Sequence, residues 1–343
     1  MEFLKYRQTI TFLAAITAFF FHCSRSGPTA AENSEMSIRL TASVTAVQPD
    51  MLEINLYNDN GFHEYQEIAP VQNNGRTDFF NVPYGWYYVD INGKVNNNRV
   101  LYGHNAFDVQ IPDPVIPVSL RNIIEVKYLN DVQEGQFLVN TVRSSMWDNI
   151  PAVSTARCLD SNNKIILRTL IASGTQYLYF LFEINDEISF TDDREPTNLG
   201  ELTNDAVIVY LCPLTPHEMS PPVPAVRFQF ETGRTILNSG LFSYMNFPDN
   251  ASREDPISAL INDDITARIS RQVEQKVLEL RIRKEILRLP ASTERNWQML
   301  GLVIRYRDGN TGQLSDWQTG NQDVNPRNNI DAWGYLEINP ELQ

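Results

Sequence analysis

Basic residues are scarce in this chain: 28 lysines and arginines stand against 42 aspartates and glutamates, which gives a net charge of −14. The sequence has no basic stripe that could neutralise phosphates, so nucleic acid is excluded as a partner. The acidic balance also argues against direct electrostatic attraction to anionic lipid headgroups. Charge of this sign mainly favours solubility.

Residues and motifs of catalytic and metal sites are equally sparse. The chain has four histidines and three cysteines, and no histidine has zinc-ligand spacing from the cysteines. Neither a Gly-x-Ser-x-Gly elbow nor a His-Glu-x-x-His motif occurs. Catalytic carboxylate pairs stay open from spacing alone, because some pair always exists among 42 acidic residues. We therefore expect a protein that is not an enzyme.

The N-terminus has the pattern of a bacterial export signal. A basic flank precedes an uncharged run, Gln8–Phe21, which is too short to span a bilayer comfortably. Cys23 follows this run, so residues 1–22 are expected to be a lipoprotein signal peptide and Cys23 the lipidated residue, although His22 replaces the small residue usual there. Cleavage near Ala30–Ala31, which would leave a soluble secreted protein, is the alternative.

Export with a lipid anchor implies an envelope protein held at a membrane. Ser24 after the cysteine is compatible with sorting to the outer membrane or cell surface, and without lipidation the chain would be periplasmic or secreted. In such an oxidising compartment Cys158 and Cys212 could form a disulfide, although nothing in the sequence brings them together.

Strand patterns divide the rest of the chain into two domains. Residues 23–36 are small and polar, as in a tether. Residues 37–121 carry short alternating strands punctuated by turn residues, which predict a small β-sandwich. Residues 122–343 predict a second, larger sandwich, because their apolar runs are denser and no convincing long helix occurs. We assume a monomer.

The second domain contains strands that are apolar on both faces. Leu178 to Ile184 and Ala206 to Leu211 are two such runs, typical of strands inside a sandwich. The stretch VEQKVLELRIRKEIL has helix-forming composition, but Leu278, Leu280 and Ile282 alternate strictly with charged residues, which favours a strand. The predicted fold class is all-β, with two antiparallel β-sandwiches.

The first domain carries a recognisable hairpin. Phe79–Val89 (FFNVPYGWYYV) resembles the f-x-x-v-p-x-G-x-Y-x-v hairpin of prealbumin-like and carboxypeptidase-regulatory-like sandwiches. The resemblance implies that Gly85 makes the tight turn and that Tyr87 enters the core. Such domains mostly serve as spacers and platforms.

The second domain, over residues 123–343, resembles a family 9 carbohydrate-binding module within the DOMON-like group. Two departures are Lys284, where the family has proline, and Ile208, where it usually has glutamate. The resemblance implies a jelly-roll-like antiparallel sandwich that binds the ends of polysaccharides between aromatic rings, without catalysis. It rests on five segments in order: Met146–Pro151, Gln176–Asp186, Thr203–Leu211, Lys276–Leu287 and Tyr306–Leu336.

Glycan recognition needs flat rings and a few hydrogen-bonding side chains. The candidate platforms are Trp317 in a polar loop, Trp333 before a strand, and Trp297, each with a core or anchoring role as the alternative. Glu279 and Arg281 lie on one face of a predicted strand and could reach sugar hydroxyls; a solvated sheet face is the alternative.

A calcium site is a further candidate, partly because relatives of the resembling family hold calcium. Calcium takes six to eight oxygen ligands, and an acidic stretch supplies carboxylates, although no EF-hand spacing is present. A solvated acidic loop is the alternative. The candidate ligands are Asp186, Asp192, Asp193 and Asp205.

Three functions remain in competition. The first is a non-catalytic envelope lipoprotein that binds a polysaccharide or other glycan on exposed tryptophans of the second sandwich. The second is a structural or protein-docking lipoprotein without a glycan ligand, which Ile208 favours. The third is a haem-binding domain, for which only His217 with Met219 or Met245 could supply axial ligands.

Overall fold

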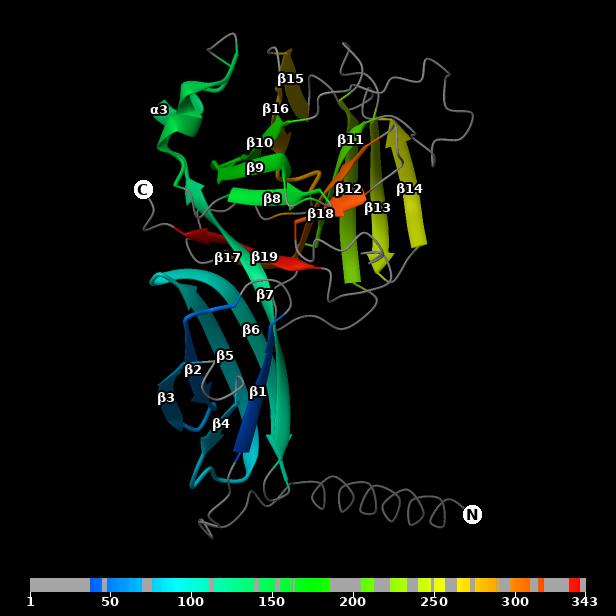
Figure 1. Ribbon diagram of the computed structural model, residues 1–343. Helices are drawn as coiled ribbons and strands as arrows, with labels where there is room; N and C mark the ends of the chain where they lie inside the picture. Colours follow the sequence, from blue (N-terminus) through cyan, green and yellow to red (C-terminus); the bar gives the residue numbers. More distant parts are fainter. Residues whose placement is uncertain are drawn as a thin grey trace, which may run out of the picture.

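The structure is a computed structural model in which strands dominate (Figure 1). The expected signal peptide and tether lie outside the described residues, and among those described no helix is long and apolar enough to cross a membrane. The described residues are 38–44, 48–69, 76–110, 114–138, 142–151, 155–160, 162, 164–185, 205–212, 223–232, 240–247, 250–256, 264–271, 275–287, 289, 297–308, 314–317 and 333–339.

The first part of the chain forms a small β-sandwich, here called the first sandwich. One sheet has the order β3-β2-β5-β6, and its strands are β2 (Met51–Tyr57), β3 (His63–Ile68), β5 (Gly85–Val95) and β6 (Asn98–Val109). The opposite sheet has β1 (Ile38–Val44) between β4 (Arg76–Phe79) and the start of β7 (Val115–Tyr128).

Alternation along these strands separates a core face from a solvent face. In β2 the side chains of Leu52, Ile54 and Leu56 are fully buried, whereas Asn55 and Tyr57 point to the other face. The same period applies to β5, so the outer face of this sheet carries polar and aromatic side chains. This outer face is where the pocket described below is found.

The expected entry of Tyr87 into the core is confirmed, but the segment is not a hairpin, because β4 pairs with β1 in one sheet and β5 pairs with β2 and β6 in the other. Gly85 has φ of +145°, a conformation that favours glycine. Tyr87 is fully buried, and its hydroxyl donates a 2.8 Å hydrogen bond to the carbonyl of Pro83.

Strand β7 belongs to both sandwiches. Its first half, Val115–Leu120, pairs in parallel with β1, and its second half, Ile123–Lys127, pairs in parallel with β19 (Gly334–Asn339). The predicted border between residues 121 and 122 therefore lies inside one continuous strand. In Figure 1 this strand runs from the lower end of the first sandwich into the second.

The second sandwich has two layers that enclose the larger core. Rings meet across it: Phe180 of β10 and Phe228 of β12 have centroids 5.5 Å apart, edge to face. One layer contains β11 (Ala206–Leu211), β12 (Val223–Glu231), β13 (Gly240–Phe247), β14 (Asn250–Pro256), β17 (Trp297–Arg307), β18 (Leu314–Asp316), β19 and the end of β7. The other contains β8 (Thr155–Leu159), β9 (Ile165–Ser173), β10 (Tyr177–Ile184), β15 (Ile265–Arg271) and β16 (Lys276–Arg283).

The all-β sandwich class is confirmed, and so is the choice of a strand for the helix-like stretch that became β16. Two short helices, α3 (Asp131–Glu134) and the 3-10 helix η1 (Ser145–Asn149), follow β7. They lie over the outside of the β9–β10–β16 layer, where Phe137, Met146 and Trp147 pack with Tyr179. This covering segment decides which side chains of β16 reach solvent.

The possible disulfide between Cys158 and Cys212 is absent. Cys158 and Cys212 are both buried and are not bonded to each other. The thiol of Cys158 instead lies 3.4 Å from the carbonyl oxygen of Ile304 in the facing layer. Buried thiols of this kind behave as small core residues.

Candidate functional site

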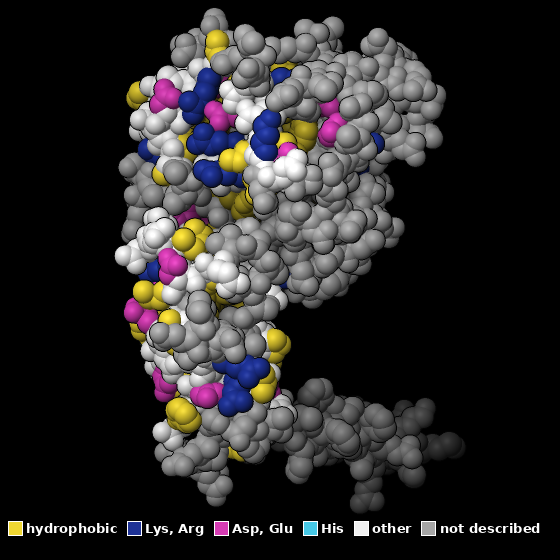
Figure 2. All heavy atoms as spheres, viewed as in Figure 1, with side chains coloured by type: hydrophobic (Ala, Val, Ile, Leu, Met, Phe, Trp, Pro, Cys, Tyr) yellow, Lys and Arg dark blue, Asp and Glu magenta, His cyan; other side chains and the backbone are white. Residues whose placement is uncertain are grey.

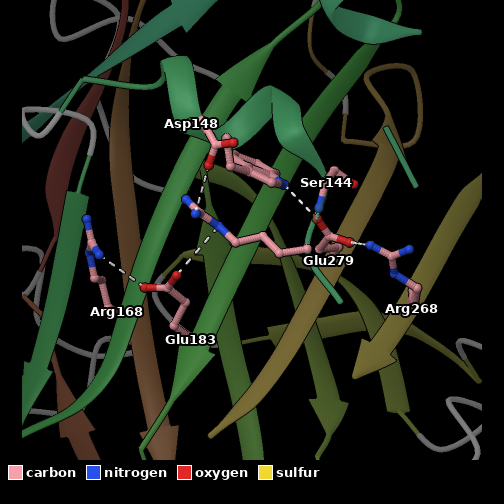
Figure 3. A network of polar contacts seen from close by, with 8 residues as sticks. Ser144, Asp148, Arg168, Glu183, Arg268 and Glu279 are labelled. Carbon is pink, nitrogen blue, oxygen red and sulfur yellow. Dashed lines mark hydrogen bonds and ion pairs between the residues drawn. The ribbon is translucent and has the colours of Figure 1, made fainter. Parts of the chain in front are cut away.

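Glu279, predicted to face a glycan, is an internal anchor. It is fully buried, and it accepts hydrogen bonds from the backbone N–H of Ser144 at 2.7 Å and from Trp147 Nε1 at 2.9 Å. Arg268 forms an ion pair with its second oxygen. Figure 3 shows these groups converging on Glu279 from η1 and β15. The prediction is corrected: a carboxylate enclosed in this way has no solvent-facing edge.

A second set of ion pairs fixes the same covering segment. Arg143 lies 3.1 Å from Asp148 and 3.7 Å from Glu183, and Arg168 approaches Glu183 at 3.2 Å (Figure 3). Lys and Arg side chains gather with acidic ones over this upper part of the body in Figure 2. The Arg143–Glu183 pair joins residues 143–148 to β10, and Glu183 also pairs with Arg168 of β9, so this face of the layer is occupied by the protein's own chain.

Arg281 keeps partial exposure. Its guanidinium lies 4.6 Å from the ring centre of Tyr177 and 5.6 Å from that of Phe137, and Nη2 donates to Thr266 Oγ1 at 3.0 Å. Stacked guanidinium and phenol groups can face a sugar, so a role for Arg281 in ligand contact stays a prediction.

The three tryptophans do not form an exposed row. Trp333 is only 5% exposed and lies 6.3 Å from the ring of Tyr210, so its predicted role as an open platform is corrected. Trp317 is half-buried against the core, and a methyl group added at Gly334 would lie 2.6 Å from its ring. Trp317 is therefore seated on the glycine backbone. The side chain of Trp297 lies outside the described residues.

The structure describes only some of the residues that were candidates for binding calcium or haem. Asp205 is fully buried and pairs with Lys276 Nζ at 3.4 Å, which makes it an internal ion pair. Within the described part of the chain, no group of three His, Cys, Asp or Glu side chains could hold a metal ion. The other candidates, Asp186, Asp192, Asp193, His217, Met219 and the side chain of Met245, lie outside the described residues.

A shallow pocket of about 620 Å³ opens on the outer face of the first sandwich. Four neighbouring strands, β2, β3, β5 and β6, contribute to it, because their outward positions alternate with core positions. The lining side chains combine two amides, two phenols, an imidazole, a carboxylate and a guanidinium. They are Asn55, Tyr57, His63, Asp90, Asn92, Arg99 and Tyr102.

Asp90 organises the centre of this pocket. The hydroxyl of Tyr57 donates to one of its oxygens at 2.8 Å, and the hydroxyl of Tyr102 donates to the other. His104 Nδ1 also lies 2.9 Å from the second oxygen. Burial raises the pKa of Asp90, but the hydrogen bonds from His104, Tyr102 and Tyr57 outweigh it, so the pKa lies below its ordinary value. Asp90 is therefore a carboxylate at neutral pH.

The two phenols are held neutral. Burial comes first among the causes that raise the pKa of Tyr57 and of Tyr102 well above the ordinary value, and the neighbouring Asp90 carboxylate adds to it. Because both O–H groups donate to Asp90, the phenol oxygens keep lone pairs available as acceptors.

Arg99 links the pocket to the second sandwich. Its Nε donates to Asn92 Oδ1 at 2.6 Å, and its guanidinium lies 5.2 Å from the ring centre of Tyr102. The same group forms ion pairs with Glu337, and with Glu125 at 3.8 Å, both in strands of the second sandwich. The orientation of Arg99 is therefore fixed from both sides.

Aromatic rings form a row beside the pocket. Tyr57 and Tyr88 stack with centroids 5.5 Å apart, and Tyr88 and His104 stack at 6.3 Å. Together with Asp90, this row gives the outer face both flat apolar area and fixed polar groups. Such a combination can bind a ligand that has hydroxyl groups and an apolar ring face.

Comparisons with known proteins give only remote likenesses. No protein-family model and no curated protein sequence matches the chain. A family 9 carbohydrate-binding module from Caldicellulosiruptor kristjanssonii, solved with cellotriose, has 14% identity and a TM-score of 0.40, covering 64% of this chain and 94% of its own. A protein of Bacteroides uniformis titled as a candidate carbohydrate-binding protein has 10% identity and a TM-score of 0.41, covering 64% and 99%. Likenesses this remote do not decide what this chain binds.

Proposed function

We propose that this chain is a non-catalytic glycan-binding envelope lipoprotein whose glycan site is the pocket on the first sandwich. The observation that supports it is the Asp90 centre, where one carboxylate fixes two tyrosine hydroxyls beside a stacked aromatic row. In this proposal the glycan binds to the first sandwich, away from the tryptophans of the second.

The pocket offers the paired chemistry that sugar hydroxyls need. Each sugar hydroxyl donates one hydrogen bond and accepts others, so a glycan site needs donors and acceptors side by side. The phenol oxygens of Tyr57 and Tyr102 supply acceptors. Asn92, whose oxygen is occupied by Arg99 Nε, supplies its two amide N–H donors. Exposed apolar area comes from the rings beside them.

The second sandwich then serves mainly as a support. Glu279 and Trp333, two of the five expected ligand groups, are enclosed by the protein itself. The same observation favours the alternative of a structural or protein-docking lipoprotein, in which neither sandwich binds a glycan. In both cases Cys23 is the proposed lipidated residue, tested by the loss of fatty-acid labelling in Cys23→Ser.

Glycan-array binding of the full chain tests the glycan site. Tyr57→Phe and Asn92→Ala each remove one polar group from the pocket, and each is expected to weaken binding about tenfold, the effect of about 1.4 kcal/mol. Asn60→Ala, which removes an exposed amide in the turn after β2, is the matched control and should bind as the parent does.

Two outcomes would reject this site. If both pocket variants bind as the parent does while Arg281→Ala loses binding, the glycan site lies on the second sandwich. If no glycan is retained and a protein is captured from membrane extract by the parent chain, the docking alternative holds.

A further inference from the structure

Exposed apolar side chains gather at one end of the first sandwich. Phe80 is 62% exposed, Tyr84 45%, Trp86 52% and Val115 60%, and these are four of the eight large apolar side chains that the described residues expose. Their neighbours Phe79 and Tyr87 are fully buried. The core is therefore complete without them, and their exposure needs another explanation.

Strand pairing places these four residues at the same end. Ile38 of β1 pairs with Phe79 of β4, and the next residue, Arg39, pairs with Val115 of β7. Phe80, Tyr84 and Trp86 lie in the connection from β4 to β5 and at the first positions of β5. We call these four residues the apolar end.

The apolar end is the part of the first sandwich farthest along β7 from the second. Val115 begins this strand, which joins the second sandwich at Ile123, eight residues later. In Figure 2 apolar side chains (yellow) are visible at the lower end of the body, where Figure 1 draws the ends of β4 and β7. A surface at this end is free of contact with the other sandwich.

The chain arrives from its N-terminus at this same end. β1 begins at Ile38, which is 15 residues after Cys23. A fully extended stretch of this length spans about 50 Å. A lipid on Cys23 would therefore keep the apolar end within about 50 Å of the membrane, whereas the second sandwich would lie farther out.

The residue types suit the interface of a bilayer. Tryptophan and tyrosine rings partition to the headgroup level, where the ring is in an apolar layer and the polar tip stays wet. This contact is driven by ring burial at the headgroup level and needs no basic patch. We propose that the apolar end rests in the headgroup region of the membrane that carries the lipid anchor. This inference rests on the anchoring part of the proposed function and not on glycan binding.

Fluorescence quenching by brominated lipids tests the contact. The lipidated full chain is reconstituted in vesicles of phosphatidylethanolamine and phosphatidylglycerol, with and without brominated acyl chains. The parent is expected to lose part of its tryptophan emission in brominated vesicles. In Trp86→Phe this loss should fall at least severalfold, because the other four tryptophans lie outside the apolar end.

A combined variant measures what the contact contributes to binding. Phe80→Ser, Tyr84→Ser and Trp86→Ser are introduced together in the Cys23→Ser chain, and flotation with the same vesicles is compared with the Cys23→Ser chain alone. We expect at least tenfold weaker partitioning. The matched control changes three exposed apolar residues elsewhere to serine, Val132, Val142 and Leu159, and should float as the starting chain does.

Three results would overturn the inference. If the parent and Trp86→Phe are quenched equally, the lipid on Cys23 anchors the chain but the apolar end does not contact the membrane. If the reconstituted chain does not associate with vesicles at all, both the lipid anchor and the membrane contact of the apolar end are rejected. Glycan binding is then still to be tested separately. A dimer in light scattering that the combined serine variant abolishes would assign the apolar end to a second copy of this chain.

Discussion

Replacing Lys284 by methionine should stabilise the protein. Lys284 lies just after β16, is 1% exposed, and has its ammonium 5.9 Å from the ring centre of Tyr128. Burial lowers its pKa from 10.5 to about 8, and Glu134 offsets only part of this effect. Each pH unit of this difference corresponds to about 1.4 kcal/mol, so holding the charge in the folded state costs about 3 kcal/mol at neutral pH. Methionine keeps the unbranched stem without the charge.

The pH dependence of this gain has a defined sign. Because the folded pKa lies below the unfolded one, the unfolded chain binds more protons between pH 8 and pH 10.5, the folded and unfolded values. The free energy of unfolding of the parent therefore rises with pH across this window, while that of Lys284→Met lacks this rise. The advantage of the variant, about 3 kcal/mol at neutral pH, should shrink towards zero near pH 10.5.

Urea unfolding of the parent and Lys284→Met at neutral pH and near pH 10 measures both effects. Raised tyrosine pKa values are common to the two chains, so they cancel in the difference. Lys164→Met, at an exposed position in a turn, should change stability by less than about 0.5 kcal/mol. A variant that is less stable than the parent at neutral pH, or a stability gap that does not change with pH, would refute the reasoning.

Three further substitutions test the pocket and the network around it. Asp90→Asn should remove stability that is present above the ordinary pKa of about 4 and is lost as the pH falls through the lowered folded value. Acid unfolding monitored by circular dichroism should then become less steep in the variant. Arg99→Met removes the cation that Glu125 and Glu337 share, so its melting temperature should fall at pH 7 and recover partly in mildly acidic solution, because burial raises the pKa of Glu125 above its ordinary value. Glu279→Gln removes the buried carboxylate that pairs with Arg268 and should cost about 3 to 5 kcal/mol in urea unfolding.

The strands that the sequence predicted well are those whose two faces differ strongly or are both apolar. β2 and β5 alternate between buried and partly exposed positions, β16 alternates between aliphatic and charged residues from Leu278 to Arg283, β11 is apolar throughout, and β10 is apolar except for Glu183. Burial imposes these patterns directly, because one misplaced residue would put a polar group in the core. Their positions could therefore be predicted without knowing which strands pair.

Strands without such a contrast escaped prediction. β3 has the sequence HEYQEI and no buried position, because it lies at the edge of its sheet and is held by backbone pairing with β2. β6 contains the polar Gly103–Asn105 step, which interrupts its apolar pattern. That step stays in the strand because it pairs continuously with β5. In both cases the strand is held by backbone pairing with the strand that precedes it, which the side-chain pattern does not reveal.

The sequence could not predict which of the candidate site residues are exposed to solvent. Glu279 occupies an outward strand position as predicted, but residues 144–147 arrive from far away in the chain and enclose it. Trp333 is enclosed in the same way beside Tyr210. The missed pocket did leave a signal, namely polar and aromatic residues at the outward positions of adjacent strands, such as Tyr57 and Asp90. That signal becomes specific only when the pairing of the strands is known.

The side chains of the pocket are held in place without a ligand. This lowers the free-energy cost of binding, so that a few weak contacts can retain a ligand. Tyr57 and Tyr102 are held by Asp90, and Arg99 is held by Asn92 and by Glu337. Ordering a free side chain on binding costs about 0.5 to 1.5 kcal/mol, so side chains that are already fixed spare a shallow site that loss. A site of few hydrogen bonds can then retain a hydroxyl-rich ligand. Loosening this support, as in Asp90→Asn, should therefore weaken binding even where every lining group that touches the ligand is still present.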